Sequence, residues 1–193
     1  CVTRPSQIEY LAVNKGGDLA VKRETQVQTA LDAGCSHIWL IDGDMIYPSD
    51  ILIRLFRLLK QGADLAGGLC YRGFPPYEPI AKNPKNPLQN MLPFIDFEFG
   101  DIIKPKATGA ACLLVKREVF ESVSRPWFKT LYIPGNPSIL KQSEDIYFTN
   151  RATTAGFKLW IDTAIDVDHV REIGINRDLY FVHQLFIRLM GTN

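Results

Sequence analysis

The chain has 193 residues, of which 46% are apolar and 22% charged, a balance typical of a globular protein and unlike that of a disordered or membrane-embedded one. Lys and Arg number 22 against 21 Asp and Glu, so the bulk charge gives no reason to expect nucleic acid as a partner. The length fits one domain with its own core, and we predict a single domain over residues 1–193. No apolar run approaches the roughly 18 residues of a membrane span, and the four cysteines form no Cys-x-x-Cys pair, which together predict a cytoplasmic protein with reduced thiols.

The first part of the chain predicts strands that alternate with helices. Short apolar runs predict the strands, and apolar residues at helical spacing between capping residues and glycines predict the helices. In chain order these are a strand at 8–13, a helix that Asp18 caps and Gly34 ends, a strand at 37–41, a helix at about 50–61 that Ser49 caps, and a strand at 63–70. This alternation is typical of an α/β fold, so we predict a mixed, mainly parallel sheet flanked by helices.

The second part of the chain departs from this alternation. Residues 71–93 contain six prolines and show no clear period, which predicts a long irregular loop. The elements predicted after it are an antiparallel, half-exposed strand at 94–99, a buried strand at 107–115, a short helix at 116–123, an irregular loop at 124–142, a helix at 144–155 that Ser143 caps, a strand at 157–167, and a C-terminal helix at about 178–190.

Two aspartates directly follow the apolar run at 37–41. Asp42 and Asp44 are separated by one glycine, and we expect them at the carboxyl end of a buried strand, where open α/β sheets bind ligands. Two carboxylates this close repel each other unless a positive charge lies beside them, and a hard divalent cation is the simplest candidate. The alternative is an acidic turn before the next helix, but the position after a buried strand favours a metal site.

A second acidic cluster is Ser143-Glu144-Asp145, at the start of the helix predicted at 144–155. The free backbone N–H groups and the dipole of a helix start favour negative charge, which by itself explains acids at this place. A carboxylate held there could also act as a general base toward a hydroxyl group.

A third cluster, Asp166-Val167-Asp168-His169, follows the last predicted strand. A lone histidine is more often a core or surface residue than a ligand. Beside carboxylates at a strand end, however, His169 becomes a candidate metal ligand, because neutral imidazole binds divalent manganese or zinc.

Five motifs occur in an order that resembles a known family. They are Leu-Ile-Asp-Gly-Asp-Met at 40–45, Ala-Thr-Gly-Ala-Ala-Cys-Leu-Leu-Val-Lys-Arg-Glu-Val-Phe at 107–120, Ser-Glu-Asp-Ile-Tyr-Phe at 143–148, Ala-Gly-Phe-Lys-Leu-Trp-Ile-Asp at 155–162, and Asp-His at 168–169. Over about residues 18–170 this order is similar to that of a family 2-type glycosyltransferase of the GT-A fold.

The resemblance implies a GT-A-like, Rossmann-like catalytic domain. Its nucleotide- and metal-binding part would span about residues 8–70 and its acceptor part about 71–170, with the C-terminal helix after them. The family's usual first strand, which carries a Pro-x-x-Asn-like turn that helps to seat the base, has no counterpart in this sequence. The identity of the base is therefore left open.

The resemblance also implies roles for the acidic residues and the histidine. Asp44 and His169 would bind Mn²⁺ or Mg²⁺, and Asp42 would lie beside the ribose or assist the metal. Asp145 would be the base that deprotonates the acceptor hydroxyl, while Glu144 would position the acceptor or the donor.

Further residues would contact the two substrates. Arg23, Thr108 and Gly109 would line the site of the nucleotide sugar. Trp127 and Tyr132 are candidates for the acceptor site by position only, and the alternative for both is a loop anchored by its aromatic side chains.

The implied activity is metal-dependent transfer of a sugar from a nucleotide-diphosphate sugar to a glycan or another hydroxyl acceptor. A UDP-sugar is favoured over a GDP-sugar, and one base without a second nucleophile indicates inversion at the sugar carbon. A sugar nucleotidyltransferase is an alternative, although Asn14-Lys15-Gly16-Gly17 is a poor substitute for the glycine-rich basic loop of that class. A non-catalytic module that binds nucleotide sugars is a third possibility.

Overall fold

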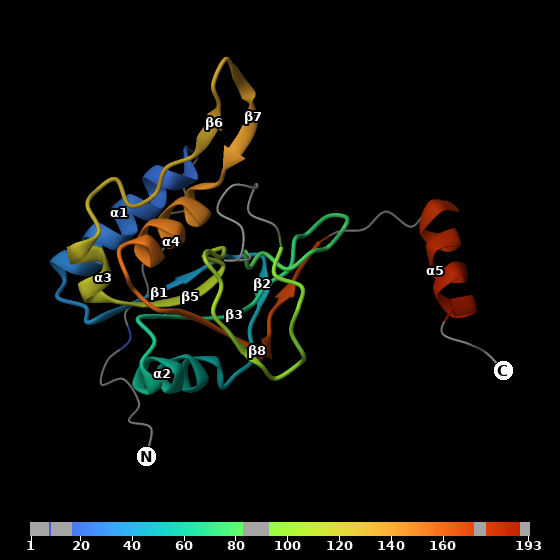
Figure 1. Ribbon diagram of the computed structural model, residues 1–193, viewed down its shortest axis with the longest axis horizontal. Coiled ribbons are helices and arrows are strands. Elements are labelled where there is room, and N and C mark those ends of the chain that lie inside the picture. The colour runs from blue at the N-terminus through green and yellow to red at the C-terminus, as the bar shows by residue number, and fades with distance from the viewer. Residues whose placement is uncertain (1–7, 9–16, 83–92, 172–176, 190–193) are drawn as a thin grey trace.

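The computed structural model describes residue 8 and residues 17–82, 93–171 and 177–189 (Figure 1). The strand predicted at 8–13 lies outside the described residues, apart from Ile8. The described elements are α1 (Leu19–Asp32), β1 (His37–Ile41), β2 (Met45–Ile46), α2 (Ile51–Gln61), β3 (Leu65–Leu69), β4 (Ile102–Ile103), β5 (Cys112–Lys116), α3 (Arg117–Ser122), β6 (Leu131–Ile133), β7 (Asn136–Gln142), α4 (Glu144–Thr154), β8 (Leu159–Asp166), β9 (Asp168–His169) and α5 (Arg177–Leu189).

The central sheet has five strands in the order β1-β5-β3-β8-β4. β3 and β8 run parallel, whereas β5 runs antiparallel to both β1 and β3, and β4 runs antiparallel to β8. The fold is therefore mixed α/β, but the prediction of a mainly parallel sheet was wrong. A continuous apolar run indicates that a strand is covered on both faces and says nothing of its direction, and the long connection from β3 to β5 lets the chain return antiparallel.

Helices cover both faces of this sheet (Figure 1). On one face α1, α3 and α4 pack over a cluster of apolar side chains that includes the fully buried Val27, Phe120 and Phe148. On the other face α2 packs with Leu55 and Leu58 over a second apolar cluster. The sheet is thus the middle of three layers, and its ends carry the polar residues described below.

The helices form close to their predicted places, and two of their caps differ from the prediction. The carboxylate of Asp18 accepts a hydrogen bond from the backbone N–H of Ala20 at 2.8 Å, as a capping residue should. The residue that precedes α2 is Asp50 rather than Ser49, and its side chain makes no capping hydrogen bond. Ser143 does precede α4, but its hydroxyl group does not cap the helix and bonds to Asp145 instead.

Two predictions for the second part of the chain were wrong. Residues 94–99 form no strand: Ile95 and Phe99 are 73% and 79% exposed, and Phe94 and Phe97 pack against the core from an irregular segment. The loop predicted at 124–142 contains the antiparallel hairpin β6–β7, which projects from the body in Figure 1. Its turn includes Gly135 at a φ of 79°, a conformation that glycine adopts without strain.

The C-terminal helix is confirmed as α5, and it lies apart from the sheet in Figure 1. Four of its apolar side chains are more than half exposed, namely those of Tyr180, Phe181, Val182 and Leu185. No helix in the described parts of the chain has the length and apolar character needed to cross a membrane.

The aromatic stack beneath α4 gives a first testable prediction. The ring of Phe148 is fully buried and stacks on that of Phe120 at a centroid distance of 4.8 Å. Because truncation leaves a cavity in a packed core, Phe148→Ala should lower the free energy of unfolding by about 3–5 kcal/mol. Phe99→Ala is the matched control, since Phe99 is 79% exposed, and it should change stability by no more than about 0.5 kcal/mol. Urea unfolding measures both, and equal effects would contradict the assignment of the core.

Candidate functional site

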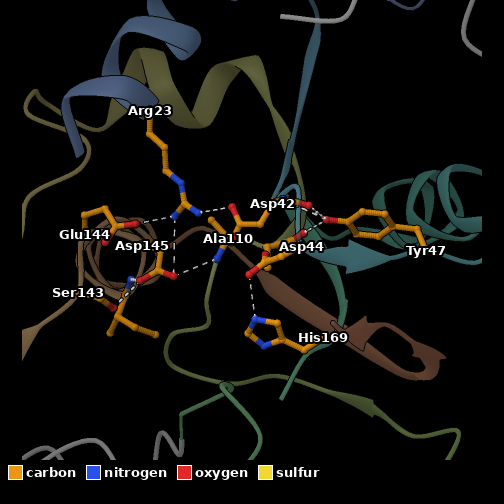
Figure 2. A network of polar contacts seen from close by, with 11 residues as sticks. Arg23, Asp42, Asp44, Tyr47, Ala110, Ser143, Glu144, Asp145 and His169 are labelled. Atoms are coloured by element: carbon orange, nitrogen blue, oxygen red, sulfur yellow. Dashed lines mark hydrogen bonds and ion pairs between the residues drawn. The ribbon is translucent and has the colours of Figure 1, made fainter. Parts of the chain in front are cut away.

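The three acidic clusters meet at one end of the sheet (Figure 2). β1 ends at Ile41 and delivers Asp42 and Asp44. The end of β8 leads into β9, which pairs with β2 so that His169 lies opposite Met45. The first turn of α4 delivers the second cluster, which includes Glu144 and Asp145. Residues more than one hundred positions apart in the sequence are thereby brought into contact.

Asp44 and His169 are within contact distance of each other. The Nε2 atom of His169 lies 3.3 Å from the Oδ2 atom of Asp44, although 125 positions separate the two residues. Burial alone would raise the pKa of Asp44, but the nearby Arg171 and His169 outweigh it and lower the pKa below its ordinary value. The carboxylate of Asp44 is therefore charged at neutral pH and turned toward the imidazole.

The second nitrogen of His169 is held by the backbone. Its Nδ1 atom lies 2.9 Å from the carbonyl oxygen of Tyr71, and because a carbonyl can only accept, Nδ1 carries the proton. The charged carboxylate of Asp44 can likewise only accept, so the 3.3 Å contact needs a proton on Nε2, which a metal ion bound to this nitrogen would replace. A histidine whose other N–H is bound to a backbone carbonyl is the usual arrangement of a metal ligand.

These two side chains fit a cation that takes its remaining ligands from elsewhere. Among the described residues, no group of three or more His, Cys, Asp and Glu side chains forms a ready-made metal site. Mg²⁺ in phosphate-binding proteins commonly uses one or two protein ligands and completes its shell with phosphate oxygens and water. The mixed nitrogen and oxygen donors of His169 and Asp44 suit Mn²⁺ in that manner, whereas Mg²⁺ prefers oxygen ligands.

Arg23 joins the first cluster, through Asp42, to the second, through Glu144. Its side chain comes from α1 and is only 5% exposed, and its Nη2 donates to Asp42 Oδ1 at 2.7 Å while its Nη1 donates to Glu144 Oε1 at 2.8 Å. The same Nη1 lies 3.8 Å from Asp145 Oδ2. Burial would lower the pKa of Arg23, but the three carboxylates outweigh it and raise that pKa, so the guanidinium stays charged. Figure 2 shows it between the carboxylates of β1 and α4.

Glu144 is the more deeply buried of the two acids on α4. Its side chain is 10% exposed, against 19% for Asp145. Burial, together with the negative charge of Asp145, raises the pKa of Glu144 even though Arg23 opposes this. One guanidinium cannot neutralise three carboxylates, and Glu144 is the one whose proton affinity rises.

Asp145 is held at both oxygens. Its Oδ1 accepts from the hydroxyl of Ser143 at 2.5 Å and from the backbone N–H of Ile146 at 2.7 Å, and its Oδ2 accepts from the backbone N–H of Ala110 at 3.3 Å. These contacts fix the direction of the carboxylate, which keeps part of its surface exposed. A carboxylate with this position and orientation can accept a proton from a bound hydroxyl group.

The segment at 108–110 lies against Asp145, and the predicted role of Thr108 and Gly109 at the site of the nucleotide sugar stays a prediction. A Cβ atom at Gly109 would lie 3.2 Å from Asp145 Oδ2 and 2.9 Å from Ile80 Cγ2, so glycine allows the backbone to approach the carboxylate. Thr108 is buried, and its N–H and carbonyl both bond to the hydroxyl of Thr149 on α4. Thr108 therefore fixes the segment to α4 through its backbone.

The two aromatic candidates for an acceptor site lie in different surroundings. Trp127 is 4% exposed, stacks edge-on against Phe120, and donates its indole N–H to the backbone carbonyls of Phe120 and Val123. It is a core residue with no accessible ring face, so the structure corrects its assignment to the acceptor site. Tyr132 lies on the hairpin strand β6 and is 51% exposed, and its role stays a prediction.

Tyr47 is a site residue that the sequence did not reveal. Its hydroxyl accepts from the backbone N–H of Asp42 at 3.0 Å and donates to the carbonyl of Ala111 at 2.6 Å, and its ring packs edge-on against Trp39. Burial raises the pKa of Tyr47, so the hydroxyl keeps its proton and acts as a brace between β1 and the segment that precedes β5. A single tyrosine after an acidic turn has no sequence feature that would identify it as a site residue.

The raised pKa of Glu144 predicts how stability depends on pH. The native carboxyl binds its proton more readily than the unfolded one, whose ordinary pKa is 4.5, so its contribution to stability is complete below that value and is lost as pH rises through the native pKa. The unfolding free energy of the wild type minus that of Glu144→Gln should therefore fall as pH rises above about 4.5. Urea unfolding at several pH values, with chelator present, measures this difference.

In the same experiment, the unfolding free energy of the wild type minus that of Asp44→Asn should change with pH in the opposite direction. Because the native pKa of Asp44 is below its ordinary value of 3.8, its contribution is present above that pH and is lost as pH falls. A wild-type-minus-Glu144→Gln difference that stays constant or grows with pH would contradict the assignment for Glu144.

The comparisons with known proteins give a likeness in fold. No protein-family model matches the sequence, and no curated protein matches it significantly. Among solved structures, the chain is similar to A197 from STIV, with a TM-score of 0.64 and 17% sequence identity over 86% of this chain and 74% of that one. At this identity the likeness shows the fold and carries no statement about activity.

Proposed function

We propose that this chain is a metal-dependent glycosyltransferase with a GT-A-like active site, which moves a sugar from a nucleotide-diphosphate sugar to a hydroxyl acceptor. The observation that carries the proposal is the meeting of Asp44 and His169 at 3.3 Å, with the other imidazole nitrogen bound to a backbone carbonyl. The convergence of Asp145 on the same end of the sheet supports it.

In this proposal Asp44 and His169 hold the divalent cation. The bound cation would stabilise the negative charge that grows on the departing diphosphate. Asp42 is already engaged by Arg23, and its side chain is 35% exposed, which leaves part of the carboxylate surface for a ribose hydroxyl. Arg23 itself has little exposed surface, so its role is to hold Asp42 and Glu144 in place.

Asp145 acts as the base. Its carboxylate accepts the proton of the acceptor hydroxyl while the acceptor oxygen bonds to the sugar carbon and the bond from that carbon to the diphosphate oxygen breaks. One such displacement inverts the configuration at the sugar carbon. The absence of a side chain at Gly109 lets the backbone lie against Asp145, and the N–H of Ala110 helps to orient the carboxylate. The proposal includes a cytoplasmic location. The free thiols of Cys35, Cys70 and Cys112 agree with this, because the cytoplasm keeps thiols reduced.

The first experiment identifies the reaction. The purified chain is screened with Mn²⁺ and a panel of nucleotide sugars by thermal shift, because a ligand that binds the folded state raises the apparent stability. Products are then analysed with each donor that binds. Release of a nucleoside diphosphate supports sugar transfer, release of pyrophosphate indicates a nucleotidyltransferase, and donor binding without turnover toward any acceptor indicates a binding module.

Asp145→Asn tests the base. Asparagine keeps an oxygen that can accept hydrogen bonds but cannot take up the proton, so turnover should fall by about 10²- to 10⁴-fold while donor affinity is nearly unchanged. Kinetics with a saturating donor, together with calorimetry of donor binding, measure the two quantities. Full activity in this variant would show that another group is the base.

Asp44→Ala tests the cation. Removing the carboxylate should weaken donor binding strongly and abolish its dependence on Mn²⁺, because His169 would be left as a lone protein ligand. Asp50→Ala is the matched control, since Asp50 is exposed and makes no capping hydrogen bond. Calorimetry with and without chelator measures the effect, and an unchanged dependence on Mn²⁺ in Asp44→Ala would refute the metal role.

A further inference from the structure

Asp44 has a second side-chain partner, Arg171, which no motif in the sequence singles out. The Nη1 atom of Arg171 donates to Asp44 Oδ2, which is the same oxygen that faces Nε2 of His169. The Arg171 side chain therefore occupies the approach to the oxygen that a cation would use.

Backbone segments on two sides fix the position of Arg171. The N–H of Val170 donates to the carbonyl of Asp44 at 2.9 Å, which continues the pairing of β2 with β9 and places the next residue beside the carboxylate. On the other side, a Cβ atom at Gly73 would lie 2.3 Å from Nε and 3.0 Å from Cζ of Arg171. The guanidinium thus packs over a stretch of backbone that has no side chain.

A cation and this guanidinium compete for the same carboxylate oxygen. Two positive charges on one oxygen repel each other, so a divalent cation can bind Asp44 well only when the guanidinium moves away. The side chains of Arg171 and Asp44 are 43% and 45% exposed, so water solvates this ion pair and little free energy is needed to separate it. A displaced guanidinium beside a bound cation is well suited to a phosphate, which it can grip with two parallel hydrogen bonds.

We propose that, without ligands, the guanidinium of Arg171 binds Asp44 where the cation would bind. When cation and nucleotide bind together, the guanidinium moves from Asp44 to the diphosphate of the donor. This inference rests on the proposed function, since it assumes that Asp44 binds a cation and that the ligand carries a diphosphate. Its consequence is thermodynamic coupling between the cation and the nucleotide. A cation alone must displace Arg171 from Asp44, whereas a cation that binds together with the nucleotide leaves Arg171 a phosphate as its new partner. Coupling of this kind is reciprocal, so each ligand tightens the binding of the other by the same factor.

The test is a Mn²⁺ titration of the wild type and of Arg171→Gln by calorimetry, first without nucleotide and then with uridine diphosphate or guanosine diphosphate. Without nucleotide, the variant should bind Mn²⁺ about fivefold more tightly, as expected from the loss of a competing exposed ion pair. With nucleotide, the variant should gain less than the wild type, because the phosphate contact is gone. A loss of structure would weaken Mn²⁺ binding, so tighter binding distinguishes the two causes.

Two further variants sharpen the result. Arg171→Lys keeps the charge but loses the paired donors, so it should bind Mn²⁺ alone nearly as weakly as the wild type and show an intermediate coupling factor. Arg54→Gln removes a comparable arginine, which pairs with Asp162 at 3.3 Å on another part of the fold, and should leave the Mn²⁺ titration unchanged. Thermal unfolding confirms that each variant is folded.

The outcomes separate this inference from the proposed function. Coupling in the wild type with the same or weaker Mn²⁺ affinity in Arg171→Gln overturns the inference and leaves the proposed function standing. An effect of Arg54→Gln equal to that of Arg171→Gln also overturns it, because the effect would then follow from net charge. If no protein binds Mn²⁺ with either nucleotide, the metal-dependent function fails and the inference fails with it.

Discussion

The guanidinium of Arg23 lies between carboxylates that come from two separate parts of the chain, and the geometry of the candidate site depends on it. Asp42 at the end of β1 and Glu144 at the start of α4 both bind it at less than 3 Å, and the arginine is almost fully buried. A buried pair of this kind is costly to desolvate, and removal of one partner is more costly still, because a charge is then left without compensation. The ion pairs therefore specify how β1, α1 and α4 fit together rather than add much to overall stability.

The same arrangement accounts for the unequal properties of the two acids on α4. Glu144 faces the arginine and is largely withdrawn from solvent, so its carboxylate is committed to the structure. Asp145 points toward the open side, where the backbone N–H groups of Ile146 and Ala110 and the hydroxyl of Ser143 orient it. The two neighbouring acids thus differ in environment, since Glu144 is 10% exposed and paired with Arg23 whereas Asp145 is 19% exposed. The distinction follows from which side of the helix start packs against α1.

Much of the fold and of the candidate site could be predicted from the sequence. One physical reason accounts for the parts that could not be predicted. Helical periodicity and glycine stops located α1, α2 and α4, and buried runs located β1 and β8, because these are local properties of the chain. Strand direction, the β6–β7 hairpin and the core position of Trp127 depend on pairing with distant residues, so local patterns did not reveal them. The motif order correctly brought Asp44 to His169, since each motif ends a predicted strand. Tyr47 and Arg171 were missed because nothing in their local sequence distinguishes them from an ordinary turn tyrosine or surface arginine.

The site consequently has two halves built on different principles. Around Arg23 the guanidinium and Glu144 are buried and paired, and these ion pairs hold the first turn of α4 and the end of β1 in one geometry. Around Asp44 the carboxylate and Arg171 are 45% and 43% exposed, and a single carboxylate oxygen contacts both this guanidinium and the imidazole of His169. Exposed ion pairs are weak and exchange easily, whereas buried ones do not. Under the proposed function, the exchangeable half would receive the phosphates of the nucleotide and the fixed half would hold the proton acceptor. The distribution of burial in this chain follows that division.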